Sequence, residues 1–385
     1  MTDLALRTAP ARTDGRLPAL LGYAAVRALG LLALALVSAA RGADPRTLLS
    51  ARWDSLWYIR VAELGYGYQV RLPNGDVHSN LAFFPLLPWL ERLGTALTPL
   101  SYADTGLLVS ASASLAAAAG IHAVTARVYG GRAALYAVLL WAVLPVGIVQ
   151  SMAYSESLFT ALAAWSLYAV LTGRWAGAGA LALLAGLTRP VGLAVVAAVW
   201  AAAVRAHVRE RRTGGAGARA GAARLLGVVL APLGTAGYVL WVGHRTGGGP
   251  FGYLDVQAGW RNGFDGGYAF ARFVGGKFSS FPSALAGVGL LAGVGLVVWL
   301  YVTCVRQRQP LPLLVYAGAV SALALCASSY FGSKPRLLLP AFPLLLPLAR
   351  ALAGWRPYRA AALVGVVAVA SALYGAVWLN GSGPP

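Results

Sequence analysis

The chain of 385 residues is 58% hydrophobic and only 11% charged, whereas a soluble domain usually carries about 25% charged residues. Apolar runs of about 20 residues, the length that a helix needs to cross a bilayer, recur along nearly the whole chain. The composition therefore excludes an ordinary soluble protein and predicts an all-α polytopic membrane protein. The net charge of +19 does not indicate nucleic-acid binding, because the basic residues are scattered among short loops between apolar segments.

No sequence pattern indicates a metal or a cofactor. The two cysteines, Cys304 and Cys326, lie in or beside apolar segments and predict neither a disulfide framework nor a metal cluster. The sequence has no His, Cys or acid cluster with metal-ligand spacing, no Asp-x-Asp in its polar segments, no P-loop and no dinucleotide fingerprint. We therefore expect no metal, no cofactor and no site for a soluble nucleotide sugar.

In chain order, the hydropathy pattern predicts a polar tail over residues 1–16 and then roughly eleven membrane crossings, all within one integral membrane domain spanning 1–385. The predicted spans cover residues 17–40, 105–126, 132–150, 156–172, 175–187, 190–206, 224–243, 283–303, 311–331, 336–352 and 359–379. Two long polar segments, 42–104 and 244–282, lie between spans. A shorter loop rich in glycine and arginine is predicted at 207–223.

The basic residues indicate one consistent orientation. With the N-terminus in the cytoplasm, the short basic loops all fall on the cytoplasmic side, in agreement with the positive-inside rule. These loops contain Arg127 and Arg132, Arg174, the 205–224 cluster, Arg306 and Arg308, and the arginines of 350–359. Segments 42–104 and 244–282 then form a first and a second outer loop. Nine of the 12 acids lie on the outer side, which suggests polar chemistry there, although longer outer loops alone would also produce this bias.

The first outer loop begins with a cluster of rare side chains, RWDSLWYIR at residues 52–60. From Trp53 to Leu64 the apolar residues recur at helical spacing, which predicts an amphipathic helix lying in the membrane interface. A loop with turn signals follows at 71–80. The apolar stretch 81–97, which contains two prolines, predicts a second short helix near the membrane surface or a partial re-entry.

Asp54 lies at the centre of the RWDSLWYIR cluster and permits two interpretations. It could be a first-turn helix acid that is favoured by the helix dipole and pairs with Arg52 or Arg60. Alternatively, it could be a general base in a cleft, where it deprotonates a sugar hydroxyl. The adjacent tryptophans could stack on sugar rings or hold a lipid chain. Spacing alone leaves both interpretations open.

Four further charged residues stand in apolar surroundings on the predicted outer side, namely Glu156, Arg189, Lys334 and Arg336. An acid such as Glu156 needs a partner or water there, unless it is simply a helix-start acid. The three cations could hold a lipid-linked phosphate near helix N-termini, or they could contact lipid headgroups non-specifically. His78, in the first outer loop, could be a second acid or base or a hydrogen-bond donor to substrate, but a lone loop histidine is more often neither.

Five motifs follow one another between about residues 50 and 350, namely RWDSLWYIRVAELGY, AFFPLLPWL, YSESLF, TRPVG and KPRLLLPAFPL. Together they resemble the PIG-V-like mannosyltransferases, which are membrane glycosyltransferases of the GT-C superfamily. The resemblance implies a GT-C-like helical fold whose large first outer loop carries a catalytic acid. It also implies a polyprenyl-phosphate sugar donor, usually of mannose, and a glycolipid, glycan or protein acceptor. The arginine- and alanine-rich composition suggests a bacterial relative in the plasma membrane.

Matched residue by residue, the resemblance makes Asp54 the catalytic acid of an inverting transfer on the outer face. Glu156 is expected to hold a sugar hydroxyl. The other candidate substrate-binding residues are Trp53, Trp57, Tyr58, His78, Phe84, Arg189, Lys334 and Arg336, of which the last three are expected to hold the donor phosphate. This sequence has Trp57 where the family motif more often has histidine, and it has one acid where other GT-C enzymes have two adjacent ones.

A polytopic transporter or lipid flippase for a polyprenyl-linked or glycolipid substrate is the competing class. It predicts charges near the bilayer midplane and a repeated half-structure, whereas the acids here lie near the outer ends of spans and no repeat is visible. We therefore expect no charge in the middle of a span. A non-catalytic membrane scaffold is a third class, and it would tolerate substitution of Asp54.

Overall fold

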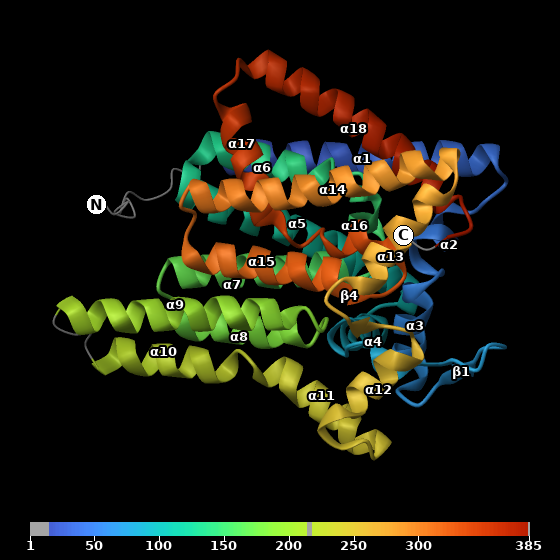
Figure 1. The fold of residues 1–385 in the computed structure, drawn as a ribbon, viewed down its shortest axis with the longest axis horizontal. Coiled ribbons are helices and arrows are strands. Elements are labelled where there is room, and N and C mark those ends of the chain that lie inside the picture. The colour runs from blue at the N-terminus through green and yellow to red at the C-terminus, as the bar shows by residue number, and fades with distance from the viewer. Residues whose placement is uncertain (1–14, 214–217, 384–385) are drawn as a thin grey trace.

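The computed structural model describes residues 15–213 and 218–383 of the chain. Most of the predicted tail at 1–16 and the centre of the predicted loop at 207–223 lie outside these residues. The longer helices lie side by side (Figure 1) and are α1 (Arg16–Ala40), α5 (Tyr102–Tyr129), α6 (Gly131–Ala142), α7 (Ser155–Leu171), α8 (Trp175–Gly186), α9 (Gly192–Thr213), α10 (Ala218–Leu230), α11 (Leu233–Thr246), α14 (Phe281–Arg306), α15 (Leu311–Cys326) and α18 (Pro357–Leu379). The shorter elements are α2 (Pro45–Ser50), α3 (Asp54–Leu64), α4 (Leu86–Leu97), α12 (Gly252–Gly259), α13 (Tyr268–Gly276), α16 (Lys334–Leu337), α17 (Leu346–Ala353), β1 (Gln69–Arg71), β2 (Val77–Ser79), β3 (Gly263–Phe264) and β4 (Ala327–Ser328).

The prediction of an all-α polytopic membrane protein is confirmed. Among the described residues, six helical segments are individually long and apolar enough to cross a membrane, and α10 and α11 together form one of them. The segment that contains α16 and α17 is a bent pair, which makes a seventh crossing if it is one broken span. The other predicted spans coincide with the shorter apolar helices α6, α7, α8 and α15.

Three predicted boundaries differ from the structure. The helix expected to reach residue 150 ends at Ala142, because Pro145 cannot donate a backbone hydrogen bond within a helix. The last span but one is bent by 73° around Pro340, and the same property of proline accounts for the break. The loop predicted at 207–223 is shorter, because α9 and α10 both extend into it.

Arg27 is a charge in the middle of α1, so the expectation that spans carry no central charge is wrong. Its guanidinium group donates hydrogen bonds to the backbone oxygens of Ala142 and Gly147, where α6 ends. One turn earlier on α1, Tyr23 stacks on Trp141 with ring centroids 5.4 Å apart. The end of α6 therefore supplies backbone acceptors for a guanidinium group at membrane depth.

Glycines allow α8 to pack closely on α10 and α11. A Cβ atom added at Gly179 would come within 2.4 Å of the backbone oxygen of Gly227, and one added at Gly234 would come within 1.9 Å of the backbone oxygen of Leu183. Small residues permit such close approach in membranes, where van der Waals packing drives helix association. This packing fixes the direction of α11 and thus the place from which residues 247–280 emerge.

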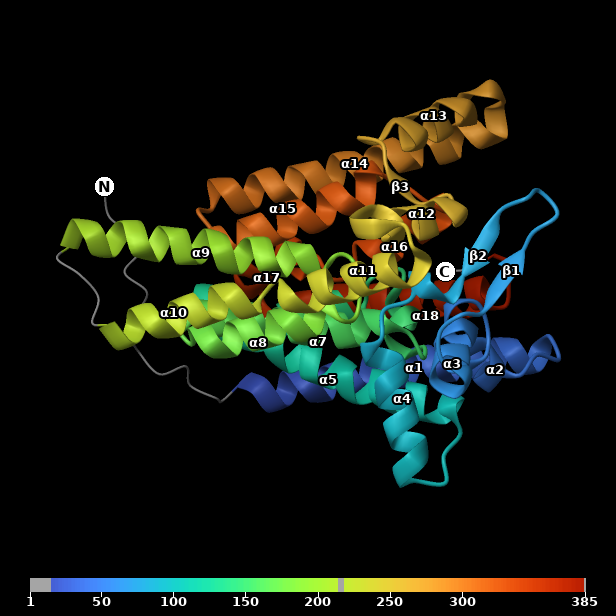
Figure 2. The same ribbon diagram turned by 90° about the horizontal axis from the view of Figure 1, so that it is seen from below.

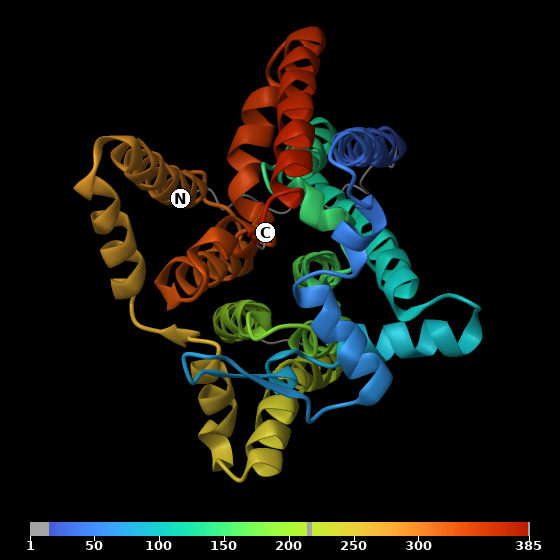
Figure 3. The ribbon, with the colours of Figure 1, turned by 90° about the vertical axis from the view of Figure 1, so that its right-hand side faces the viewer.

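Both long connections gather at one end of the bundle. Residues 41–101 join α1 to α5, and residues 247–280 join α11 to α14. Figure 2 shows that the β1–β2 hairpin, α3 and α13 lie at this end, which we call the hairpin end. In the end-on view of Figure 3, α4 extends sideways from the long helices. The β3–β4 pair, in which Gly263 pairs with Ser328, ties the second connection to the end of α15.

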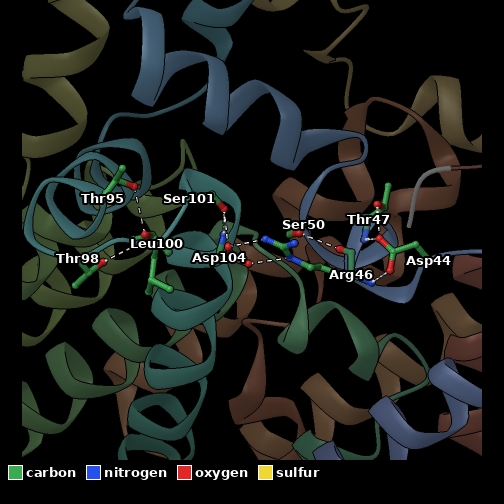
Figure 4. Close-up of polar contacts among 10 residues, drawn as sticks. Asp44, Arg46, Thr47, Ser50, Thr95, Thr98, Leu100, Ser101 and Asp104 are labelled. Atoms are coloured by element: carbon green, nitrogen blue, oxygen red, sulfur yellow. Dashed lines mark hydrogen bonds and ion pairs between the residues drawn. The ribbon is translucent and has the colours of Figure 1, made fainter.

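A polar clamp holds α2 against the start of α5 (Figure 4). Asp44 caps α2 by accepting hydrogen bonds from the backbone N–H groups of Arg46 and Thr47. Arg46 Nη2 lies 2.6 Å from Asp104 Oδ2, and the Ser101 hydroxyl donates to the same oxygen over 2.7 Å. The clamp therefore fixes the direction in which the chain approaches α3.

The helix predicted from RWDSLWYIR is α3, which has one buried face and one exposed face. The face that packs inside the protein carries Ser55, Tyr58, Val61 and Ala62. Leu56 and Leu64, which belong to the predicted apolar stripe, are exposed. The apolar stripe therefore lies partly on the outer surface of α3, as an interfacial helix requires.

The helix α4 buries an unpaired carboxyl group. Glu91 is 0% exposed, neither of its oxygens has a hydrogen-bond partner in the described part of the chain, and its side chain lies against Gly106 of α5. Burial raises the pKa of Glu91 well above its usual value. On the other side of the helix, Trp89, Leu93 and Leu97 are exposed, as expected for a helix at a membrane surface.

We expect the contribution of Glu91 to stability to decrease as the pH rises, and Glu91→Gln to remove this dependence. The folded protein retains the proton to a higher pH than the unfolded chain, whose glutamate pKa is about 4.3. The contribution is therefore complete below about pH 4 and declines by up to about 1.4 kcal/mol per pH unit until the folded-state pKa is passed. Thermal unfolding of wild type and Glu91→Gln in detergent at several pH values measures this pH dependence. The exposed Glu63→Gln on α3 is the control, and equal pH dependence in wild type and Glu91→Gln would contradict the assignment.

Candidate active site

The turn before α3 is strained, and it places Asp54 at the first position of the helix. Trp53 has a φ of 54° and a ψ of −123°, a backbone conformation that is unfavourable for a bulky residue. The Arg52 guanidinium carbon lies 4.1 Å from the centroid of the Trp53 ring, and its nitrogens donate to the backbone oxygens of Leu379 and Gly381. The end of α18 therefore holds the strained turn in place.

Four charged side chains from distant segments meet at Asp54. Arg336 Nη1 lies 2.8 Å from Asp54 Oδ2, and Arg336 Nε lies 3.2 Å from Glu156 Oε1. Arg189 Nη1 lies 2.5 Å from the same Glu156 oxygen. We call these four residues the charge network. It joins α3, α16, α7 and the α8–α9 loop, and its two carboxylates balance its two guanidinium groups, as buried charges require.

Exposure distinguishes the two acids of the network. The side chain of Asp54 is 28% exposed, whereas that of Glu156 is 1% exposed and lies between two arginines. Of these two acids, Asp54 is therefore the one that a substrate can reach, and Glu156 orients the arginines. The alternative in which Asp54 pairs with Arg52 or Arg60 is wrong, because its partner is Arg336.

Tyr154 supports the network and was missed by the sequence reasoning. Its hydroxyl accepts a hydrogen bond from the Asp54 backbone N–H over 3.3 Å. The Arg336 guanidinium carbon lies 5.0 Å from the centroid of its ring, in reach of a cation–π interaction. Tyr154 therefore positions both members of the Asp54–Arg336 pair. The available signal was its place in the YSESLF motif, two residues before Glu156.

Ser155 connects the network to Tyr58. The Ser155 hydroxyl accepts a hydrogen bond from Arg189 Nη1 over 3.2 Å and lies 2.7 Å from the Tyr58 hydroxyl. Tyr58 is 5% exposed, so the structure places this candidate substrate-binding residue behind the network, where it braces Ser155. Ser155 was also missed, although it directly precedes Glu156 in the same motif.

Lys334 does not join the charge network. Its Nζ donates hydrogen bonds of 2.8 Å to the backbone oxygens of both Ala324 and Ala327, at the end of α15. The rings of Phe270 and Phe331 lie 4.9 Å and 5.6 Å from the same nitrogen. Lys334 thus caps carbonyl groups at the C-terminal end of a helix, a position that favours a cation.

The predicted aromatic residues divide between two clusters. Trp57 stacks on Phe83, and His78 stacks on Trp260. Phe84 belongs to a different cluster, in which it is 1% exposed and packs against Tyr238 of α11 and Tyr253 of the second connection. The structure therefore places Phe84 in the packing between the two long connections, whereas Trp57 and His78 are only half-buried.

A cavity of about 470 Å³ opens beside the segment that contains α16. Arg272 and Lys277 line it together with Phe273 and Phe331. Neither of these two cations forms an ion pair with an acid in the described ranges of the chain. Phe331 also lies close to Lys334, so the cavity adjoins the segment that supplies Arg336.

Residues 38–209 match the family model described as mannosyltransferase (PIG-V). This part of the chain is similar to the PIG-V family. The matched segment includes Asp54, Glu156 and Arg189, whereas Arg336 lies beyond it. GPI alpha-1,6-mannosyltransferase 2 from Cricetulus griseus is 33% identical over 156 residues, which cover 38% of this chain and 30% of that protein. The match thus spans less than a third of the relative's length.

The fold of this chain is similar to that of a solved membrane glycosyltransferase. ArnT from Cupriavidus metallidurans, in a crystal structure with undecaprenyl phosphate, superposes with a TM-score of 0.54 at 18% identity, covering 92% of this chain and 63% of that one. The oligosaccharyltransferase AglB from Archaeoglobus fulgidus, in complex with an inhibitory peptide and a dolichol-phosphate, gives a TM-score of 0.47 at 13% identity, covering 94% and 56%. The ArnT match confirms the predicted GT-C-like fold.

Proposed function

We propose that this protein is an inverting glycosyltransferase that moves mannose, or a similar hexose, from a polyprenyl-phosphate donor to an acceptor hydroxyl. The observation that carries the proposal is the reachable carboxylate of Asp54, which is held by Arg336 and lies in the segment that matches the PIG-V family model. A positioned carboxylate near a substrate hydroxyl is the group that such a transfer needs as its general base.

The charge network suggests how the reaction proceeds. The acceptor oxygen attacks the anomeric carbon of the sugar while Asp54 takes the proton from that hydroxyl. The bond from the same carbon to the donor phosphate oxygen breaks, and polyprenyl phosphate leaves with the electron pair. Attack from the face opposite the leaving group inverts the anomeric configuration. Arg336 fixes the direction of the Asp54 carboxylate, and Glu156 and Arg189 hold Arg336 from the other side.

The cavity beside α16 is a suitable place for the donor phosphate. Because the leaving group carries negative charge, cations fixed near it stabilise the transition state. Of the three cations expected from the sequence, Arg189 and Arg336 are paired with acids and Lys334 with carbonyl groups. Arg272 and Lys277 are not paired with an acid in the described part of the chain, and both line the cavity. We therefore place the phosphate in this cavity, beside Arg272 and Lys277.

The two lysines of the chain offer a matched test of this placement. Lys277→Met is expected to raise the KM for polyprenyl-phosphate mannose by roughly 5–10-fold with little change in stability, because Lys277 has no acid partner in the described residues and its Nζ lies over the Phe273 ring, 4.6 Å from the centroid. Lys334→Met is expected to lower stability by roughly 1–3 kcal/mol, because carbonyl groups at the end of α15 lose their donor. Thermal unfolding and the KM for the donor are measured for both variants. A raised KM in Lys334→Met together with an unchanged KM in Lys277→Met would place the phosphate at Lys334 instead.

The orientation in the membrane is also a proposal. The basic loops favour a cytoplasmic N-terminus, which puts the hairpin end on the outer face of what we take to be a bacterial plasma membrane. A cysteine introduced at Asn74, in the exposed hairpin turn, should react with a membrane-impermeant maleimide in intact cells. If this cysteine reacted only after the membrane had been permeabilised, the hairpin end would lie on the cytoplasmic side and the proposed orientation would be wrong.

Sugar transfer itself is tested with the wild-type protein. Membranes that contain it should convert labelled polyprenyl-phosphate mannose into a mannosylated glycolipid, glycan or protein and release polyprenyl phosphate. A transporter or flippase would instead move the labelled lipid between leaflets with its sugar–phosphate bond intact. Translocation without release of polyprenyl phosphate would therefore overturn the proposal.

A further inference from the structure

Half-buried aromatic rings meet at the hairpin end, where the two long connections touch. Trp57 comes from α3, Tyr68 directly precedes β1, His78 lies in β2, and Trp260 directly follows α12. The ring centroids of Trp57 and Trp260 are 4.9 Å apart at an interplanar angle of 71°, and those of His78 and Trp260 are 4.0 Å apart and nearly parallel. We call these four rings the aromatic platform.

The aromatic platform is held rigidly by backbone contacts. The indole N–H of Trp260 donates to the backbone oxygen of Ser79 over 3.0 Å. A Cβ atom at Gly259 would come within 2.3 Å of the backbone oxygen of Val77, so the end of α12 lies directly on β2. Phe83, which is not part of the platform, stacks on Trp57 at an interplanar angle of 6°. A ligand would therefore meet rings that are already in position, which reduces the entropy cost of binding.

Two polar side chains at the platform have donors to offer. The guanidinium carbon of Arg60 lies 4.2 Å from the centroid of Tyr68 and 5.8 Å from that of Trp57. Arg60 has no ion pair with an acid, and His78 has no hydrogen-bond partner, in the described part of the chain. All four rings and Arg60 are only half-buried. A ligand at the platform can therefore contact both the rings and the hydrogen-bond donors.

We infer that the aromatic platform binds a sugar ring, one helical turn from Asp54 along α3. The apolar face of a hexose packs on half-buried aromatic rings, and its hydroxyl groups accept hydrogen bonds from Arg60 and His78. The inference rests on the proposed sugar transfer and deepens it, because it assigns Tyr68, Trp260 and Arg60 to substrate specificity. The sugar can be that of the donor or one within the acceptor, since both present the same chemistry to the rings.

Kinetics with two substrates separate these sources. Trp260→Ala and His78→Ala are expected to raise one KM by about 5–10-fold, with kcat changed less than about twofold. Varied polyprenyl-phosphate mannose reports on the donor sugar, and varied octyl α-mannopyranoside, used as an artificial acceptor, reports on the acceptor sugar. Trp299→Ala removes an exposed tryptophan on α14 and is the matched control. Trp260→Phe keeps a ring and should retain most of the affinity.

Direct binding makes the test independent of turnover. In saturation-transfer NMR of the detergent-solubilised protein, methyl α-mannopyranoside should receive saturation from wild type and from Trp299→Ala, and much less from folded Trp260→Ala. If Asp54→Asn abolishes transfer but the platform variants leave both KM values and the NMR signal unchanged, the rings serve packing alone and the inference is overturned. If wild type transfers no sugar but still binds the mannoside through Trp260, the proposed function fails and the platform stands.

Discussion

Asp54→Asn is expected to lower the kcat of mannosyl transfer by about 10²–10⁴-fold, the usual contribution of a general base. Asparagine has nearly the shape of aspartate and can occupy the same position beside Arg336, but it cannot accept the proton of the acceptor hydroxyl. The strained turn at Trp53 and the hydrogen bond from the residue 54 backbone N–H to Tyr154 do not depend on the carboxylate. The variant should therefore fold, and labelled polyprenyl-phosphate mannose measures its remaining activity in membranes.

Two variants control for the loss of charge in this experiment. Glu63→Gln removes an exposed carboxylate later on α3 and should leave kcat unchanged. Asp54→Glu keeps an acid but moves it by one methylene group, so it should retain more activity than Asp54→Asn. A folded Asp54→Asn protein with near-normal turnover would show that Asp54 is not the base and would favour a scaffold.

The sequence predicted the helices better than it predicted their side-chain partners. Spans were recognisable because each must present a long apolar surface to lipid, a property of the local sequence. The broken segments were not, since Pro145 and Pro340 lie within apolar runs whose length suggested continuous helices. Arg27 was missed for a related reason, because its acceptors exist only where α6 ends against α1.

The candidate site was predictable only in part. Asp54, Glu156 and Arg189 lie in motifs, but the pairing of Asp54 with Arg336 depends on how α3 and α16 meet in the fold. Lys334 stands two residues from Arg336 in the sequence, yet it points to the end of α15. No motif marked Trp260, because its role arises from contact of the second connection with the first.

Arg336→Met is expected to abolish detectable transfer and to lower the free energy of unfolding by about 3–5 kcal/mol, the usual effect of breaking a buried ion pair. Arg336 is 9% exposed and is shared by two carboxylates. Without it, Asp54 and Glu156 face a single remaining guanidinium group, that of Arg189. Thermal unfolding in detergent and transfer of labelled mannose are measured on the same preparations.

A double variant separates the structural role of Arg336 from its role in the reaction. Asp54→Asn combined with Arg336→Met leaves Glu156 paired with Arg189, so charge balance returns and much of the lost stability should be recovered. Activity should not return, because the base is still absent.

Arg336→Lys keeps the positive charge, but a lysine ammonium group cannot contact both carboxylates as the planar guanidinium group does. This variant should therefore remain folded, with activity reduced by about 10–100-fold. Two results would contradict this coupling: an Arg336→Met protein as stable as wild type, or a double variant that recovers no stability. Either result would mean that Asp54 and Glu156 are not coupled through Arg336 and act in independent pairs.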